Sequence, residues 1–149
     1  MSDSEPLDTT AGPSVGVVVV THGLLATELL NAAEAIVGDL PRFTAVSIGW
    51  HDDVAVATSA MARAIERVDA GVGVLLLTDM FGGTPSNLAM TFLQAGRLEV
   101  VTGVNLPMLI KLARTVSSGD VLLAARAIAA DGREAIRVAS DLLRGSDPE

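Results

Sequence analysis

The sequence contains no cysteine. This excludes disulfide bonds, thiolate nucleophiles and cysteine-ligated zinc or iron–sulfur centres. Aromatic residues make up only 3% of the chain, so the core must be aliphatic, and Met80, Met90 and Met108 are expected to fill gaps in it. No apolar run is long enough to cross a bilayer as a helix. The first residues also lack the basic and apolar regions of a secretory signal, so a cytoplasmic protein is expected.

Positive charge is scarce. Ten Lys and Arg residues stand against 18 Asp and Glu residues, which gives a formal net charge of −8. This charge argues against binding to nucleic acid or to anionic lipid, both of which select clustered basic residues. A length of 149 residues, half of them hydrophobic, fits one domain with its own core. We expect a single domain at 14–144, with polar flexible tails at 1–13 and 145–149.

Apolar strands and amphipathic helices alternate along this domain. Apolar or alternating runs predict strands at 15–20, 43–48, 72–77 and 98–102. Helical spacing predicts helices at 25–37, 52–68 and 84–94, one from 107, and one from 118 or 120 that is interrupted near 131–132. Thr84 is expected to cap its helix, with Pro85 at the first helical position. The alternation predicts an α/β fold with a doubly wound parallel sheet and right-handed crossovers.

Ligands of such sheets bind at the carboxyl ends of the strands. His22 follows the first predicted strand and Asp79 follows the third. If these strands are neighbours, the carboxylate can accept a hydrogen bond from one ring nitrogen and leave the other nitrogen as a nucleophile. Gly23 lets a phosphate or another backbone approach closely. Taken alone, His22 reads as a loop histidine and Asp79 as a helix cap, but their placement favours a joint site.

The segment Phe81–Gly82–Gly83–Thr84 precedes a predicted helix. Consecutive backbone amides in such a turn can curve around an anion. The segment is not a Walker loop, because it contains no lysine. A nucleophilic imidazole, an orienting carboxylate and a backbone anion cradle together predict a site for phosphoryl transfer, which depends mainly on positioning and electrostatics.

Three motifs of the chain also match a known pattern: THG at 21–23, TDMFGGTP at 78–85 and GVNLPML at 103–109. In order and spacing, roughly residues 15–143 resemble the IIA component of the mannose-type branch of the phosphoenolpyruvate:sugar phosphotransferase system. This resemblance implies a three-layer α/β/α sandwich with strand order 2-1-3-4. In that order the first and third strands are neighbours.

The resemblance also implies a reaction and its partners. His22 would be phosphorylated on the nitrogen away from Asp79 by the phosphocarrier HPr, itself charged by enzyme I. The phosphate would pass to a IIB protein and then to a sugar entering through membrane IIC and IID components. No cofactor is expected. Thr84 matches a hydroxyl position near the phosphate, and Asn105, Pro107 and Met108 match a loop that walls the site.

Members of this family are commonly homodimers and are often fused to a IIB domain. No such domain is expected after residue 143. The segment ASDLLRGSDPE at 139–149 also shows no strand of the kind that supports dimerisation in some relatives. The expectation of a dimer therefore stays open at this point.

Trp50 and His51 follow the second predicted strand and either flank His22, where they meet a partner, or lie in a solvated loop. In the second case Asp52 caps the next helix. A metal site formed by His22, His51 and Asp79 has no supporting spacing motif, so no metal is expected.

Three alternative functions stay open. A regulatory phosphocarrier of an incomplete sugar system, or of a dihydroxyacetone-kinase relay, would use the same residues. A receiver-like domain phosphorylated on Asp79 would need an acidic pair after the first strand and a lysine near the last, and both are missing. A nucleotide-binding module would need a glycine pattern that the turn THGLLA lacks.

Overall fold

A computed structural model describes residues 14–49, 51–115 and 119–144. The strands are β1 (Gly16–His22), β2 (Phe43–Ile48), β3 (Val74–Thr78) and β4 (Leu98–Thr102). The helices are α2 (Leu25–Val37), α3 (Val54–Val68), α4 (Thr84–Met90), α5 (Leu106–Arg114), α6 (Val121–Glu134) and α7 (Ala139–Leu143). The tails predicted at 1–13 and 145–149 lie outside the described residues, as does Trp50.

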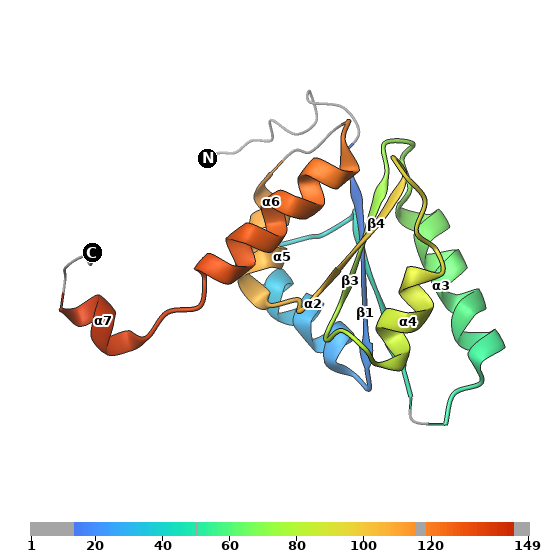
Figure 1. Cartoon of the computed structure of the whole chain (residues 1–149), viewed down its shortest axis with the longest axis horizontal. Coiled ribbons are helices and arrows are strands. Elements are labelled where there is room, and N and C mark those ends of the chain that lie inside the picture. The colour runs from blue at the N-terminus through green and yellow to red at the C-terminus, as the bar shows by residue number, and fades with distance from the viewer. Residues whose placement is uncertain (1–13, 50, 116–118, 145–149) are drawn as a thin grey trace.

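The strands form one parallel sheet in the order β2-β1-β3-β4 (Figure 1). His22 lies opposite Ile48 in β2, and Thr78 of β3 lies opposite Val20 in β1 and Thr102 in β4. All four strands therefore end at the same edge. The predicted parallel sheet and its 2-1-3-4 order are confirmed.

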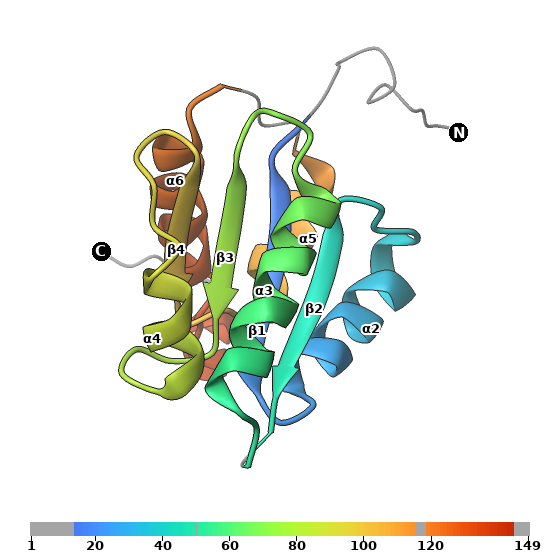
Figure 2. The ribbon, with the colours of Figure 1, turned by 90° about the vertical axis from the view of Figure 1, so that its right-hand side faces the viewer.

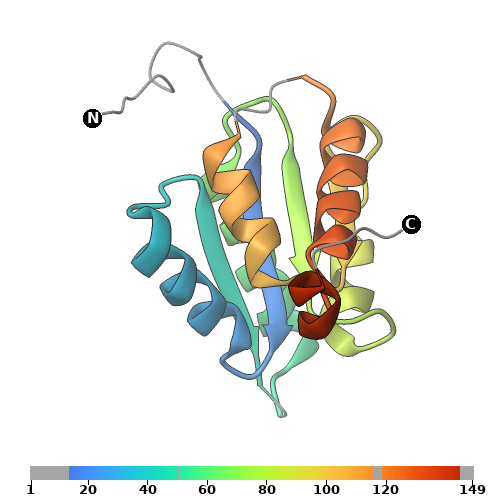
Figure 3. The same ribbon diagram turned by 90° about the vertical axis from the view of Figure 1, so that its left-hand side faces the viewer.

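Helices cover both faces of the sheet. Figure 2 shows α3 and α4 on one face, and Figure 3 shows α2, α5 and α6 on the other. The central strand alternates between them: Val17 and Val19 pack into one apolar cluster, and Val18 and Val20 pack into the other. Burying each of these side chains contributes about 1.5–3 kcal/mol. The two apolar clusters therefore pack against both faces of β1 and hold the residues at its carboxyl end in place.

The strands differ slightly from the predicted ranges. β1 runs two residues beyond the apolar run, because Thr21 and His22 stay paired with β2. β3 starts later than predicted, after Gly73, whose φ of +118° is not a strand conformation. The consequence for function is that His22 is the last residue of a central strand rather than a loop residue.

The helix ends also correct the prediction. Asp53, not Asp52, caps α3 and accepts a hydrogen bond from the amide of Ala55 at 2.9 Å. Gly83, not Thr84, is the N-cap of α4, and this helix ends at Met90 rather than near Gln94.

The last long helix is not interrupted. α6 continues through Asp131 and Gly132 to Glu134. The glycine is tolerated here because it serves packing: a Cβ on Gly132 would lie 2.6 Å from the sulfur of Met108.

Beyond α6 the chain leaves the body of the domain. Helix α7 projects away from the sheet and its covering helices (Figure 1), and none of its residues is buried. Leu143 is 88% exposed, and Ile136 and Val138 of the preceding segment are also exposed. Within the described ranges, no helix has the length and apolar character needed to span a membrane.

Candidate functional site

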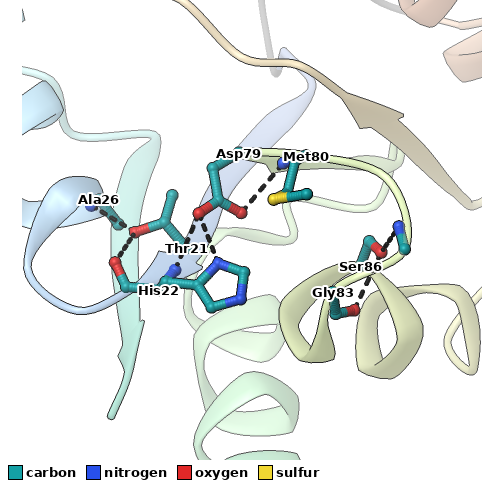
Figure 4. Close-up of polar contacts among 8 residues, drawn as sticks. Thr21, His22, Ala26, Asp79, Met80, Gly83 and Ser86 are labelled. Atoms are coloured by element: carbon teal, nitrogen blue, oxygen red, sulfur yellow. Dashed lines mark hydrogen bonds and ion pairs between the residues drawn. The ribbon is translucent and has the colours of Figure 1, made fainter. Parts of the chain in front are cut away.

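His22 and Asp79 meet at the carboxyl edge of the sheet. Nδ1 of His22 lies 2.7 Å from Oδ2 of Asp79 (Figure 4). The backbone N–H of His22 donates to the same oxygen at 3.1 Å. The imidazole is 49% exposed, whereas the carboxylate is 14% exposed. The acid is therefore recessed, and the ring above it is accessible.

The ionisation of Asp79 follows from its surroundings. Burial alone raises the pKa of this carboxyl, but hydrogen bonds from the side chain and backbone of His22, together with the charge of its ring, outweigh burial and hold the pKa below its usual value. The amide of Met80 adds a further hydrogen bond, to Oδ1 at 3.0 Å. Asp79 is thus ionised at neutral pH and can only accept hydrogen bonds.

The ionised carboxylate sets the tautomer of His22. Because Asp79 accepts, Nδ1 must carry the proton that it donates. In the neutral ring, Nε2 then holds a free lone pair, and no hydrogen-bond partner for Nε2 is found among the described residues. The geometry therefore yields a nucleophilic nitrogen on the exposed side of the ring.

Gly83 lies directly against this nitrogen. A Cβ built on Gly83 would lie 3.0 Å from Nε2 and 2.7 Å from Cε1 of His22. Any larger side chain would push the ring aside or cover its reactive atom. The second glycine of the pair is therefore needed for close approach.

The loop before α4 is held by Ser86. Its Oγ accepts from the amide of Gly82 at 2.9 Å and donates to the carbonyl of Gly83 at 3.1 Å (Figure 4). The amide of Gly82 is consequently occupied in this conformation, contrary to the prediction of a free donor. The amides of Gly83 and Thr84 have no acceptor within the described part of the chain, so they remain available to an anion.

Thr21 fixes the turn on the other side of His22. Its buried Oγ1 accepts from the amide of Ala26 at 2.6 Å and donates to the carbonyl of His22 at 3.1 Å. Gly23 adopts φ +54° and donates to the carbonyl of Ile48 at 2.9 Å. Neither Thr21 nor Ser86 was identified from the sequence, because the partner of each hydroxyl is a backbone group that only the folded loop supplies.

The residues expected to wall the site lie in the contact between α5 and α6. Asn105 caps α5 through the amide of Met108 and donates to the carbonyl of Gly132, both at 3.1 Å. Met108 is buried against Gly132. Pro107 is exposed at the start of α5. No hydrogen bond joins these side chains to His22 or Asp79 in the described residues.

His51 is exposed in the turn after β2. Asp52 accepts from the amide of Gly49 at 2.6 Å, so it closes this turn rather than capping α3. No group of three or more His, Asp or Glu residues in the described ranges could hold a metal ion.

Exposed apolar side chains come from the loops that follow β1 and β3. Leu24 and Phe81 are each 70% exposed, and Met80 is 54% exposed. Met80 was expected in the core, but it lies in the loop after β3, next to Asp79, and faces solvent. We call Leu24, Met80 and Phe81 the apolar rim. Exposed apolar residues on loops beside a site are suited to contact with another protein.

Comparison with known proteins identifies the family of this chain. The family model described as "PTS system fructose IIA component" matches residues 16–128. The sorbose-specific EIIA component of Lacticaseibacillus casei is 32% identical over 106 residues, which cover 70% of this chain and 76% of that protein. The mannose-specific EIIAB component of Escherichia coli K12 is also 32% identical, over 66% of this chain, but the match spans only 31% of that longer protein.

Solved structures have a similar fold. The mannose/sorbose-specific IIA subunit from Enterococcus faecalis superposes with a TM-score of 0.73 at 31% identity, covering 91% of this chain and 98% of that one. The IIA protein associated with the fucose utilization operon of Streptococcus pneumoniae gives a TM-score of 0.76 at 25% identity, covering 89% and 99%. The chain therefore belongs to the family of mannose- and fructose-type IIA components of the sugar phosphotransferase system.

Proposed function

We propose that this protein is a phosphohistidine carrier of a sugar phosphotransferase system, which accepts phosphate from HPr on Nε2 of His22 and passes it to a IIB protein. One observation carries the proposal: the 2.7 Å contact between Nδ1 of His22 and Oδ2 of Asp79, which leaves Nε2 free at the accessible edge. Family membership supports the general role of a phosphocarrier. In this proposal the protein works in the cytoplasm, and the phosphate passes from the IIB protein to a sugar that enters through IIC and IID components.

The Nδ1–H tautomer of His22 determines how the phosphoryl group is transferred. The lone pair of Nε2 attacks phosphorus, and a P–N bond forms as the bond from phosphorus to the donor atom of HPr breaks, its electron pair leaving with HPr. The proton on Nδ1 stays between the ring and Asp79, whose negative charge stabilises the cationic phosphorylated ring. Transfer to the IIB protein reverses these steps with a new acceptor atom.

The phosphoryl group on Nε2 would lie beside Gly83. The unoccupied amides of Gly83 and Thr84 supply hydrogen bonds to its oxygens, and the Thr84 hydroxyl supplies another. Neither a lysine nor a metal is needed, because phosphoryl transfer depends mainly on positioning and charge stabilisation.

The donor and the acceptor must reach the same atom in turn. The apolar rim of Leu24, Met80 and Phe81 comes from the loops around His22 and gives both partners one docking surface. His51 lies at the same edge and extends it on the β2 side. Sequential use of a single surface explains why the ring must be exposed while Asp79 is recessed.

Phosphorylation of Asp79 itself is the alternative least favoured by the geometry. Its carboxylate already accepts three hydrogen bonds, from Nδ1 and the amide of His22 and from the amide of Met80. A nucleophilic aspartate needs an accessible oxygen, whereas these oxygens are engaged. A regulatory phosphocarrier would use the same His22 chemistry and differs only in the acceptor.

The test is phosphorylation with radiolabelled phosphoenolpyruvate, enzyme I and HPr. We expect a label that is stable in base and labile in acid, and that maps by mass spectrometry to the peptide with His22 and not to the peptide with His51. His22→Ala should remove it. A label that survives in His22→Ala, or that base releases, contradicts the proposal.

We also propose that the protein forms a homodimer through α7. Leu142 and Leu143 are exposed on a helix that has no buried residue, and Ile136 and Val138 extend the apolar surface towards α6. An amphipathic segment that leaves its own domain is typical of packing against a second copy.

A further inference from the structure

The two outer strands of the sheet differ in how well they are protected from pairing with another strand. At the β4 edge, Gln94 forms an antiparallel bridge with Leu98, and Glu99 places a charge on the strand. Both features discourage pairing with another strand. The outer edge of β2 pairs with no other described strand, and β2 itself, FTAVSI, carries neither a charge nor a proline. Helix α2 contacts this strand through its side chains, with Thr27 Oγ1 3.3 Å from Ser47 Oγ.

The backbone of β2 offers hydrogen-bonding groups at this edge. The carbonyls of Arg42 and Ile48 accept from the amides of Val17 and Gly23, on the β1 side. Alternate residues of a parallel strand point their backbone groups to opposite sides. The N–H and C=O groups of Ala45 and Ser47 therefore point outward, away from β1.

A groove of about 330 Å³ runs along this edge between β2 and α3. Its strand side is lined by Thr44, Ala45, Val46 and Ser47. On the helix side, the small residues Ala60 and Ala64 leave space, and Arg63 and Arg67 border it. The groove thus combines unpaired strand backbone with two guanidinium groups.

Two guanidinium groups border this groove, and no acidic side chain is among the described residues that line it. Arg63 and Arg67 are four residues apart on α3, where like charges repel. Neither forms an ion pair with a described residue, whereas Arg97 pairs with Asp69 at 2.7 Å and Arg144 with Asp141 at 2.9 Å. In a chain of net charge −8, this leaves a local site suited to negative charge.

We propose that the β2 edge binds an extended acidic segment of a partner protein as an added strand. The segment would exchange backbone hydrogen bonds with Ala45 and Ser47, and its carboxylates would pair with Arg63 and Arg67. The backbone bonds supply affinity and the arginines supply selectivity for acidic sequence.

The groove lies close to the phosphorylation site, so binding there could assist phosphoryl transfer; this role rests on the proposed function. β2 ends opposite His22, so a segment held along β2 tethers its protein beside the phosphorylation site. Tethering raises the effective concentration of a partner without enlarging the apolar rim. Binding to the groove itself does not depend on His22.

The competing explanation is that Arg63 and Arg67 only keep other strands away from β2. Charged residues at a sheet edge often have this role. In that case the arginine side chains would cover the outward amides of β2, and neither an acidic nor a basic strand could pair with this edge. The two explanations therefore differ in the response to an acidic peptide.

The experiment titrates the full chain with a short blocked peptide that alternates glutamate and valine, followed by fluorescence anisotropy and by amide NMR shifts. We expect saturable binding that shifts the amides of Ala45 and Ser47 and weakens with salt. The double variant Arg63→Gln/Arg67→Gln should raise Kd about tenfold, as two partly exposed ion pairs allow. A lysine–valine peptide should not bind.

Matched variants distinguish binding in the groove from a general effect of positive surface charge. Lys111→Gln/Arg114→Gln removes the same charge from α5 and should leave Kd unchanged. Ser47→Pro removes an outward amide and should weaken binding, provided that its thermal unfolding stays cooperative. Absence of shifts at Ala45 and Ser47, or equal binding by the Arg63/Arg67 variant, overturns the proposal. Phosphorylation of His22 measured in parallel is expected to persist in the double variant, so failure of one proposal does not affect the other.

Discussion

Oδ2 of Asp79 accepts two hydrogen bonds from His22, one from the ring at 2.7 Å and one from the backbone amide at 3.1 Å. A single oxygen thus fixes both the position of the residue and the orientation of its ring. Since the carboxylate is ionised, the contact also decides which ring nitrogen carries the proton. The reactivity that we assign to Nε2 therefore depends on an atom on the far side of the imidazole.

Replacing Asp79 with asparagine tests this dependence. An amide can donate to Nδ1 as well as accept from it, so the Nδ1–H tautomer is no longer enforced and the cationic ring loses its counter-charge. We expect phosphoryl transfer from HPr to slow about 10- to 100-fold, measured by rapid quench. An unchanged rate would mean that the carboxylate has only a structural role.

The acid sensitivity of folding should report the same contact. The pKa of Asp79 is lower in the folded chain than in the unfolded chain, where it is about 3.9. Its contribution to the free energy of unfolding is therefore complete above about pH 3.9 and is lost as pH falls through the folded pKa. Urea unfolding should show that Asp79→Asn is less stable than wild type at pH 7 and that the difference shrinks towards pH 3. A difference that grows on acidification would contradict the lowered pKa.

Gly83→Ala tests the approach to Nε2. Its Cβ would meet the imidazole at 2.7 Å, so we expect a large loss of labelling with only a modest loss of stability. The matched control is Gly96→Ala, whose Cβ would meet no atom within 4 Å although its φ of +80° strains an alanine. This control should lose stability and keep its label. Full labelling of Gly83→Ala would show that the ring can move aside.

Two buried threonines next to the site should respond oppositely to valine. Thr78 Oγ1 is buried with no hydrogen-bond partner in the described residues, so Thr78→Val removes an unsatisfied group and should raise the free energy of unfolding by about 1 kcal/mol. Thr21 Oγ1 makes two hydrogen bonds, so Thr21→Val should lower it by about 1–3 kcal/mol. The urea midpoints of both variants test this difference. A destabilised Thr78→Val would mean that Thr78 Oγ1 has a hydrogen-bond partner in solution.

If the protein dimerises through α7, substitutions in this helix should lower the molecular mass measured in solution. Leu142→Ser/Leu143→Ser should convert a dimer into a monomer in sedimentation equilibrium, because it removes apolar surface without touching the sheet. Since α7 projects away from the sheet that carries His22 (Figure 1), the phosphorylation rate should be retained. A monomeric wild-type protein would dismiss the proposal.

The parallel α/β sheet followed from patterns in the chain, whereas the strand order, and with it the pairing of His22 with Asp79, followed from the resemblance to mannose-type IIA components. Buried apolar runs that alternate with amphipathic helices allow few topologies, and the motifs after the first and third strands narrowed them further. Local patterns were weaker at element ends. Pro85 was expected to follow a Thr84 cap, but Ser86 reorganises the loop and makes Gly83 the cap.

The sequence alone determined which residue types stand at the carboxyl edge, because strand periodicity and the order of elements are local properties. Only the tertiary structure decided what each of those residues does there. It recessed Asp79 and exposed His22, engaged the Gly82 amide with Ser86, and moved Asn105 and Met108 into the contact of α5 with α6. These outcomes depend on distances between segments far apart in the chain, which no local pattern encodes.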